Sequence, residues 1–229
     1  MTGLALPGAA RGYLLCWLPA FAAIALLSAA GEPALAGYFG PLGPTAGAAI
    51  CGGAGIAALW WLTHIGWLAS AARPGTRAWL LIVLAATAFA LPTIFVDSRA
   101  PFPADVNVTL PSALLFYPAI AVIAESAFHL VPLALLTGIG QMLPRKGRRA
   151  WAGVAVIAVA MVEPAFQIGL GDGGPAWRDV YLGLHLFLFG LVQLALLRRY
   201  GFGAMLGFRL VYYLHWHLLW GQLRLVLLF

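Results

Sequence analysis

Long apolar runs separated by short polar gaps dominate the chain from end to end. Seven windows are predominantly apolar over about 20 residues, the length that a helix needs to cross the hydrocarbon core of a bilayer. The windows cover residues 13–30, 45–69, 78–95, 112–138, 150–169, 180–197 and 202–227. The gaps between them hold helix breakers or charges, such as Arg73-Pro74-Gly75. The pattern predicts an all-α, polytopic transmembrane helix bundle of about seven spans.

Composition supports a chain that is spent almost entirely on membrane spans. Hydrophobic residues make up 63% of the sequence and charged residues only 9%, against about 25% charged residues in a soluble domain. No basic stripe with interleaved aromatic residues is present, which excludes a nucleic-acid partner and leaves the lipid bilayer as the expected environment. We expect one integral membrane domain over residues 1–229, with three N-terminal spans (13–95) and a four-span candidate catalytic core (112–227). A signal peptide is the alternative for the first window, but its apolar stretch is long for one.

The distribution of basic residues predicts the orientation. Nine of the thirteen Lys and Arg residues lie in alternate gaps on one side of the predicted bundle: Arg11, Arg73, Arg77, Arg145, Lys146, Arg148, Arg149, Arg198 and Arg199. The positive-inside rule then places the N-terminus in the cytoplasm and the C-terminus outside. Seven spans fit this alternation and an even number would break it. The Ala-, Gly-, Trp- and Arg-rich, lysine-poor usage is typical of a high-GC bacterium, so we expect the bacterial cytoplasmic (inner) membrane.

Several ionisable residues fall inside the predicted spans. They are Glu125, Glu163, Arg209 and all five histidines, His64, His129, His185, His215 and His217. A charged group at the bilayer centre costs about 2.5–3.5 kcal/mol on insertion scales, so such residues are candidates for function. His64 is alone on its helix and is predicted to be a packing residue.

Helical spacing predicts which of these residues share a face. Three sets follow i, i+4 spacing: Glu125 with His129, Glu163 with Gln167, and Arg209 with Tyr213 and His217. Counting 1.5 Å per residue from the span ends brings these groups and His185 to one layer between mid-bilayer and its outer third. His215 lies about 200° from His217 around the helix and is expected to point elsewhere. The alternative is that Glu125–His129 and Glu163–Arg209 are buried pairs that hold helices together.

Short motifs in the second half of the chain resemble those of the CAAX protease and bacteriocin-processing family. Ala124-Glu125-Ser126-Ala127-Phe128-His129 is similar to its first motif, Glu-Glu-x-x-x-Arg, and Tyr181-Leu182-Gly183-Leu184-His185 to its second, Phe-x-x-x-His. Leu197-Arg198-Arg199-Tyr200-Gly201-Phe202-Gly203-Ala204-Met205 is similar to the stretch before its last motif, His-x-x-x-Asn. The resemblance implies an intramembrane endopeptidase that hydrolyses a peptide bond of a membrane-associated peptide or protein, with a glutamate and a histidine activating water.

The chain departs from this family at important positions. Ala124 stands where the family has its first glutamate, and Arg209 and Tyr213 fall where His-x-x-x-Asn is expected. Asn107 is the only asparagine of the chain and lies in a predicted loop. The candidate catalytic residues are therefore Glu125, His129, Glu163, His185 and His217. Arg209, Tyr213 and Gln167 are the candidate oxyanion or supporting groups.

Two other function classes remain open at this point. His129, His185 and His217 with a carboxylate could hold zinc or another divalent ion, or two of the histidines a haem iron. No His-Glu-x-x-His motif is present, which weakens the zinc-protease form. The third class is a non-catalytic membrane scaffold, or a proton-coupled carrier that uses Glu125 and Glu163 as its relay. The cofactor stays open between none and a divalent metal.

Overall fold

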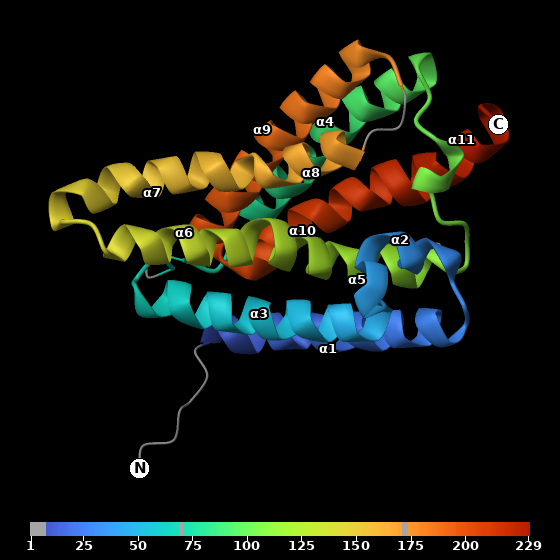
Figure 1. Ribbon diagram of the computed structural model, residues 1–229. Coiled ribbons are helices and arrows are strands. Elements are labelled where there is room, and N and C mark those ends of the chain that lie inside the picture. Colours follow the sequence, from blue (N-terminus) through green and yellow to red (C-terminus); the bar gives the residue numbers. More distant parts are fainter. Residues whose placement is uncertain (1–7, 69–70, 171–173) are drawn as a thin grey trace.

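The computed structural model describes residues 8–68, 71–170 and 174–229, and all regular structure in these residues is helical (Figure 1). The longer helices are α1 (Gly8–Ala29), α3 (Pro44–His64), α4 (Thr76–Arg99), α5 (Ala113–Ala124), α6 (Val131–Gln141), α7 (Arg145–Ala160), α8 (Val162–Leu170), α9 (Ala176–Tyr200) and α10 (Phe202–Tyr213). The shorter ones are η1 (Pro33–Leu35), α2 (Ala36–Phe39), η2 (Gly40–Leu42), η3 (Ala104–Val106) and α11 (Gly221–Leu227). Two π-helical turns, η4 (Glu125–Leu130) and η5 (Leu214–Trp220), interrupt longer helical segments.

Six helical segments in the described part of the chain are long and apolar enough to cross a membrane. They are Gly8–Ala29, Pro44–His64, Thr76–Arg99, Ala113–Gln141, Arg145–Gly169 and Ala176–Tyr200. These segments correspond to the first six predicted windows. Large apolar side chains such as Leu80, Leu84 and Leu91 of α4 are exposed on the surface, as expected where a helix faces lipid. The all-α class and an integral membrane protein are therefore confirmed.

The seventh window, 202–227, is also helical, as α10, η5 and α11 in succession. It is not among the six candidate spans, and it carries Arg209, His215, His217 and Arg224, which lower its apolar character. Both arginines are buried inside the protein. This segment is therefore less apolar than the other six. Its two arginines face protein and not lipid, which allows them to lie in a helix of the bundle.

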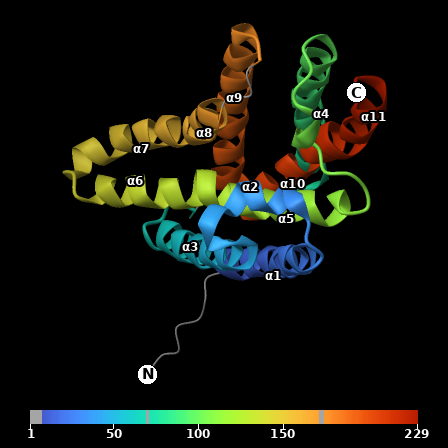
Figure 2. The same cartoon turned by 45° about the vertical axis from the view of Figure 1, so that its right-hand side comes forward.

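The segment formed by α5, η4 and α6 lies at the centre of the bundle. In its most apolar 18-residue stretch, 56% of the residues are buried, a larger share than in the corresponding stretch of any of the other five candidate spans. In Figure 1 it runs between α1 and α3 on one side and α7 and α8 on the other. Helices α4 and α9 are steeply inclined to this row, as Figure 2 shows, and α10 packs against both of them and against α5. The central segment can therefore present side chains to several helices at once.

Contacts between helix ends show which of the gaps between the predicted spans lie together. At one end, the backbone N–H of Ala72, after α3, donates to the carbonyl of Arg199 at the end of α9 over 2.9 Å. At the opposite end, Arg224 of α11 pairs with Asp97 of α4, and Arg178 of α9 donates to the carbonyl of Ala100. The start of α4 and the end of α9, which carries Arg198 and Arg199, thus meet at one end, and the end of α4 meets α11 and the start of α9 at the other.

Two glycines meet needs of the fold, one at a close approach and the other at a left-handed turn. A Cβ atom on Gly55 of α3 would overlap the phenol of Tyr13, which packs α1 against α3. Gly201 has a φ of +84° and ends α9, a left-handed conformation that glycine adopts without steric cost. The turn at Gly201 sends α10 back along α9, which brings Arg209 beside Gln193.

Candidate functional site

Arg209 of α10 is the centre of a buried polar network. Its Nε donates to Glu125 Oε1 over 2.6 Å, and its Nη1 and Nη2 donate to the two carboxylate oxygens of Glu163 over 2.8 and 2.7 Å. Nη1 also donates to Tyr213 Oη at 3.1 Å, and Nη2 to Gln193 Oε1 at 3.1 Å. A guanidinium has five N–H donors, so every donor of Arg209 has a partner. We call these five residues the Arg209 network.

The Arg209 network joins four helical segments. Glu125 lies in η4, Glu163 in α8, Gln193 in α9, and Arg209 with Tyr213 in α10. The side-chain amide of Gln193 also donates to Glu125 Oε1, which closes a ring between the first, third and last of these segments. Because charge-assisted bonds are about twice as strong as neutral ones, the network fixes how the four segments pack.

Water is almost excluded from the charged groups. Glu125 is 0% exposed, Arg209 1% and Glu163 5%. Taking a single charge out of water costs several kcal/mol, and only a well-arranged partner offsets that cost. The bidentate pairing of Arg209 with Glu163 has that geometry.

The local sequence explains how Glu125 and His129 reach the same side of the central segment. Pro132 has no N–H to give to the carbonyl four residues earlier, and its ring would collide with that carbonyl. The helix widens just before it, and the N–H of Val131 bonds to the carbonyl of Ser126 in a π-helical turn. Such turns occur often at functional sites. Glu125, Ser126 and His129 are all buried here.

His129 lies against the edge of the Arg209 network. Its Nδ1 is 3.0 Å from Glu125 Oε2, yet neither atom makes a well-aligned hydrogen bond within the described residues. On the other side, a Cβ atom added to Gly190 would lie 3.3 Å from His129 Nε2. Besides Arg209, His129 is the residue that forms an ion-pair contact with a carboxylate of the network in the described part of the chain.

The helix break before Glu163 also follows from a proline. α7 ends at Ala160 and α8 begins at Val162, and Pro164 removes the hydrogen bond to the carbonyl of Ala160. Glu163 is buried next to this break, whereas Gln167, one turn further on, is exposed. Gln167 makes no hydrogen bond to the Arg209 network, so the structure does not bring this predicted residue to the site.

His185 of α9 belongs to a different polar cluster. Thr93 of α4 lies within hydrogen-bonding distance of His185 Nε2 (3.3 Å), Tyr181 Oη (2.9 Å) and Tyr212 Oη (3.2 Å). The ring of Phe189 stacks on His185 on one side and lies under the Arg209 guanidinium on the other. The structure therefore separates His185 from both glutamates.

His217 of η5 lies in a third group. Its ring stacks on Tyr117 with the centroids 4.3 Å apart, and its Nδ1 is 3.4 Å from the amide nitrogen of Asn107. Tyr213 meets it edge-on at 4.8 Å. The predicted stripe of Arg209, Tyr213 and His217 on one face is thus confirmed, but His217 does not contact Glu125 or Glu163.

The two remaining histidines lie away from the Arg209 network. His64, which was expected to be a packing residue, is exposed and stacks on Trp60. His215 Nδ1 is 2.8 Å from the carbonyl of Val211 on its own helix. For the metal alternative, His129, His185 and His217 would have to meet. No three His, Cys, Asp or Glu side chains are grouped so as to hold a metal ion in residues 8–68, 71–170 and 174–229.

A second buried ion pair was missed by the sequence analysis. Asp97, at the end of α4, accepts from Arg224 Nε at 2.6 Å and from Arg224 Nη2 at 2.8 Å, and from Trp220 Nε1 at 2.6 Å. Arg224 also donates to Asn107 Oδ1 at 2.8 Å. Asp97 and Arg224 are both 0% exposed. This pair holds the end of the last helical segment against α4.

Gln193 was missed as well, because uncharged polar residues were considered only where they share a helical face with a candidate glutamate or arginine, as Gln167 and Tyr213 do. A signal for it exists: His185, Phe189, Gln193 and Leu197 follow i, i+4 spacing in α9, and all four are buried. A polar uncharged residue on the inner stripe of an apolar span is expected to have a polar partner, because an unpaired amide in an apolar interior is costly.

Comparison with known protein families, with characterised proteins and with solved structures gives no match. The resemblance to CAAX proteases accordingly rests on the short motifs around Glu125 and His185 and on the stretch 197–205.

Gln193 in the Arg209 network and the exposed Gln167 give a matched test of the site. Replacing Gln193 by Leu removes the amide that bonds both Glu125 and Arg209, and we expect a loss of about 1–3 kcal/mol in the free energy of unfolding because buried charged groups lose a partner. Replacing the exposed Gln167 by Leu should change it by less than about 0.5 kcal/mol. Unfolding of both variants in detergent, followed by circular dichroism, measures the difference. Equal effects of the two substitutions would contradict the arrangement described.

Proposed function

We propose that this chain is a non-catalytic integral membrane protein, a scaffold whose Arg209 network serves to join helices. The observation that carries the proposal is the saturation of Arg209: its five donors are taken by Glu125, Glu163, Gln193 and Tyr213. A general base needs a water or substrate proton within hydrogen-bonding reach. Both carboxylates are instead paired with the guanidinium and are at most 5% exposed.

The placement of the histidines supports the same proposal. A CAAX-type site requires a glutamate and a histidine from different helices to act on one water. His185 is bonded to Thr93 and Tyr181, and His217 stacks on Tyr117. Neither histidine contacts Glu125. On this proposal, the chain keeps the order of the motifs that resemble the protease family, in a related helix bundle, but does not carry out the protease chemistry.

An intramembrane peptidase of the CAAX type is the second candidate, and one observation favours it. Glu125 and His129 share one π-helical turn with Nδ1 and Oε2 3.0 Å apart, a pairing in which the carboxylate orients the imidazole that accepts a proton from water. In that function, Arg209 and Tyr213 would be the oxyanion donors, and the substrate would be a peptide or protein in the membrane.

Protein cleavage can be tested without prior choice of a substrate. The wild type and the Glu125→Gln variant are each reconstituted with a bacterial membrane fraction, and new protein N-termini are identified by mass spectrometry. A scaffold produces no N-termini that differ between the two samples. N-termini that appear with the wild type and vanish with folded Glu125→Gln would overturn the scaffold proposal and establish the peptidase. Gln193→Leu serves as the control for loss of network bonds with Glu125 intact.

We further propose seven membrane crossings, with the helical segment Phe202–Leu227 as the seventh. At about 1.5 Å per residue it is long enough to span the hydrocarbon core, and its two arginines are paired inside the protein with Glu163 and Asp97. The nine basic residues of alternate gaps support an N-terminus on the cytoplasmic side, and we take the membrane to be a bacterial inner membrane.

The topology has a direct test. A reporter fused after Phe229 should be active only outside the cytoplasm, and one inserted in the α6–α7 turn before Arg145 only inside it, because seven crossings place the two positions on opposite sides. Alkaline phosphatase and green fluorescent protein fusions at both positions report the side. Both reporters on the same side of the membrane would rule out seven crossings.

A further inference from the structure

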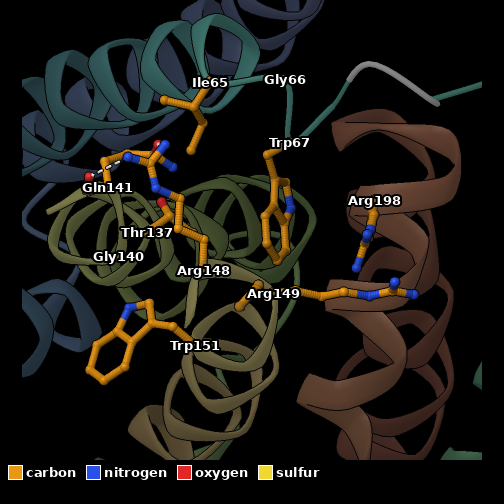
Figure 3. A pocket seen from close by; sticks show the side chains of 11 residues that line it. Ile65, Gly66, Trp67, Thr137, Gly140, Gln141, Arg148, Arg149, Trp151 and Arg198 are labelled. Atoms are coloured by element: carbon orange, nitrogen blue, oxygen red, sulfur yellow. Dashed lines mark hydrogen bonds between the residues drawn. The ribbon is translucent and has the colours of Figure 1, made fainter. Parts of the chain in front are cut away.

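A basic pocket opens at the end of the molecule where the Arg- and Lys-rich gaps meet. Its volume is about 380 Å³, within the range of about 300–1,000 Å³ that is typical of ligand sites. It lies between the end of α3, the α6–α7 turn and the end of α9. Trp67, Arg148, Arg149, Trp151 and Arg198 line it (Figure 3).

The three arginines of the basic pocket differ in what holds them. Arg148 is bound to the turn below it, since it donates to the carbonyls of Leu143 and Gln141 and to Gln141 Oε1. Arg149 and Arg198 are exposed and make no hydrogen bond or ion pair with any described residue. The guanidinium of Arg198 lies over the ring of Trp67 at 5.0 Å, and Arg149 extends toward α9, the helix that carries Arg198 (Figure 3).

No described acidic residue neutralises this end. The chain has seven acids, and the structure describes six of them: Glu32, Asp97, Asp105, Glu125, Glu163 and Asp179. None of these six forms an ion pair with Arg149 or Arg198, and the two inside spans, Glu125 and Glu163, are paired with Arg209. Arg149 and Arg198 are therefore open to a counter-charge from outside the described part of the protein.

The position of the basic pocket indicates the source of that charge. Three apolar candidate spans end around it, at His64, Gln141 and Tyr200, which places it at the level of the lipid headgroups. Trp67 and Trp151 line it as aromatic residues do at a membrane interface. Trp151 Nε1 is bound to the carbonyl of Leu136, but Trp67 Nε1 is buried without a partner in the described residues and is left as an N–H donor.

We propose that the basic pocket binds the phosphate group of an anionic phospholipid. Arg149 and Arg198 supply the positive charge and N–H donors that match phosphate geometry, and Trp67, whose Nε1–H has no partner in the described residues, packs its ring under Arg198. Basic pockets between helices on the cytoplasmic side are known to hold anionic headgroups. This inference is independent of the scaffold proposal, since none of these residues belongs to the Arg209 network.

The test uses the purified full chain, stripped of lipid in detergent, and native mass spectrometry with phosphatidylglycerol as the probe. We expect the Arg149→Gln/Arg198→Gln variant to bind phosphatidylglycerol at least about tenfold more weakly than the wild type, since two charge-assisted contacts to the phosphate are lost. The matched control is Arg73→Gln/Arg77→Gln, which removes two exposed basic residues that do not line the pocket. This control should bind as the wild type does.

Additional measurements distinguish a lipid from a soluble anion and allow for misfolding of the double variant. Phosphatidylcholine, with the same phosphate but no net charge, should bind more weakly than phosphatidylglycerol to the wild type. Inorganic phosphate that displaces the lipid and binds in its absence with equal affinity would overturn a lipid source in favour of a soluble anion. Equal losses in the pocket and control variants would overturn the site and leave only general surface attraction. Trp67→Phe keeps a ring under Arg198 and removes the N–H, and a several-fold loss in this folded variant supports the site even if the double variant fails to fold.

Discussion

A guanidinium that is buried inside a membrane protein must have all five N–H donors satisfied by the protein, and Arg209 meets this constraint. Its partners come from η4, α8, α9 and its own helix. Several features of the fold follow from the need to bring these groups together. The turn at Gly201 returns α10 along α9, and the break at Met161 directs Glu163 inward. The π-helical turn before Pro132 brings Glu125 and His129 to the same side of the central segment.

The same constraint bears on function. A carboxylate that neutralises a buried guanidinium is held in one position and is shielded from water, which suits a structural pair and not a base that must meet a substrate. In the scaffold proposal, Glu125 and Glu163 are structural partners of Arg209. His129 is the one group at the edge of the network whose Nδ1 lacks a well-aligned hydrogen bond in the described residues, and it is where a peptidase would have to begin its chemistry.

The sequence was sufficient for the fold class, for six spans and for the shared faces of Glu125 with His129 and of Arg209 with Tyr213. These depend on hydropathy and helical spacing, which are properties of one segment at a time. Residue counting also placed His185 and His217 at a similar depth to the glutamates. Depth does not determine which way a helix is turned, and Phe189 lies between His185 and Arg209. Asp97 lies two residues beyond the predicted window 78–95, and its pairing with Arg224 could not be predicted because Arg224 is 127 positions away in the sequence.

The account depends most on the coupling between Arg209 and Glu163, and a double-mutant cycle measures it. Arg209→Met, Glu163→Gln and the double variant are unfolded in mixed micelles, and their free energies of unfolding are compared with that of the wild type. Breaking a buried pair by removing one partner costs about 3–5 kcal/mol, and each single variant should be destabilised in this way. The double variant should then be more stable than the sum of the single losses predicts, by about 0.5–3 kcal/mol. Strictly additive losses would show that the two residues do not interact, and would contradict the network as the basis of the fold.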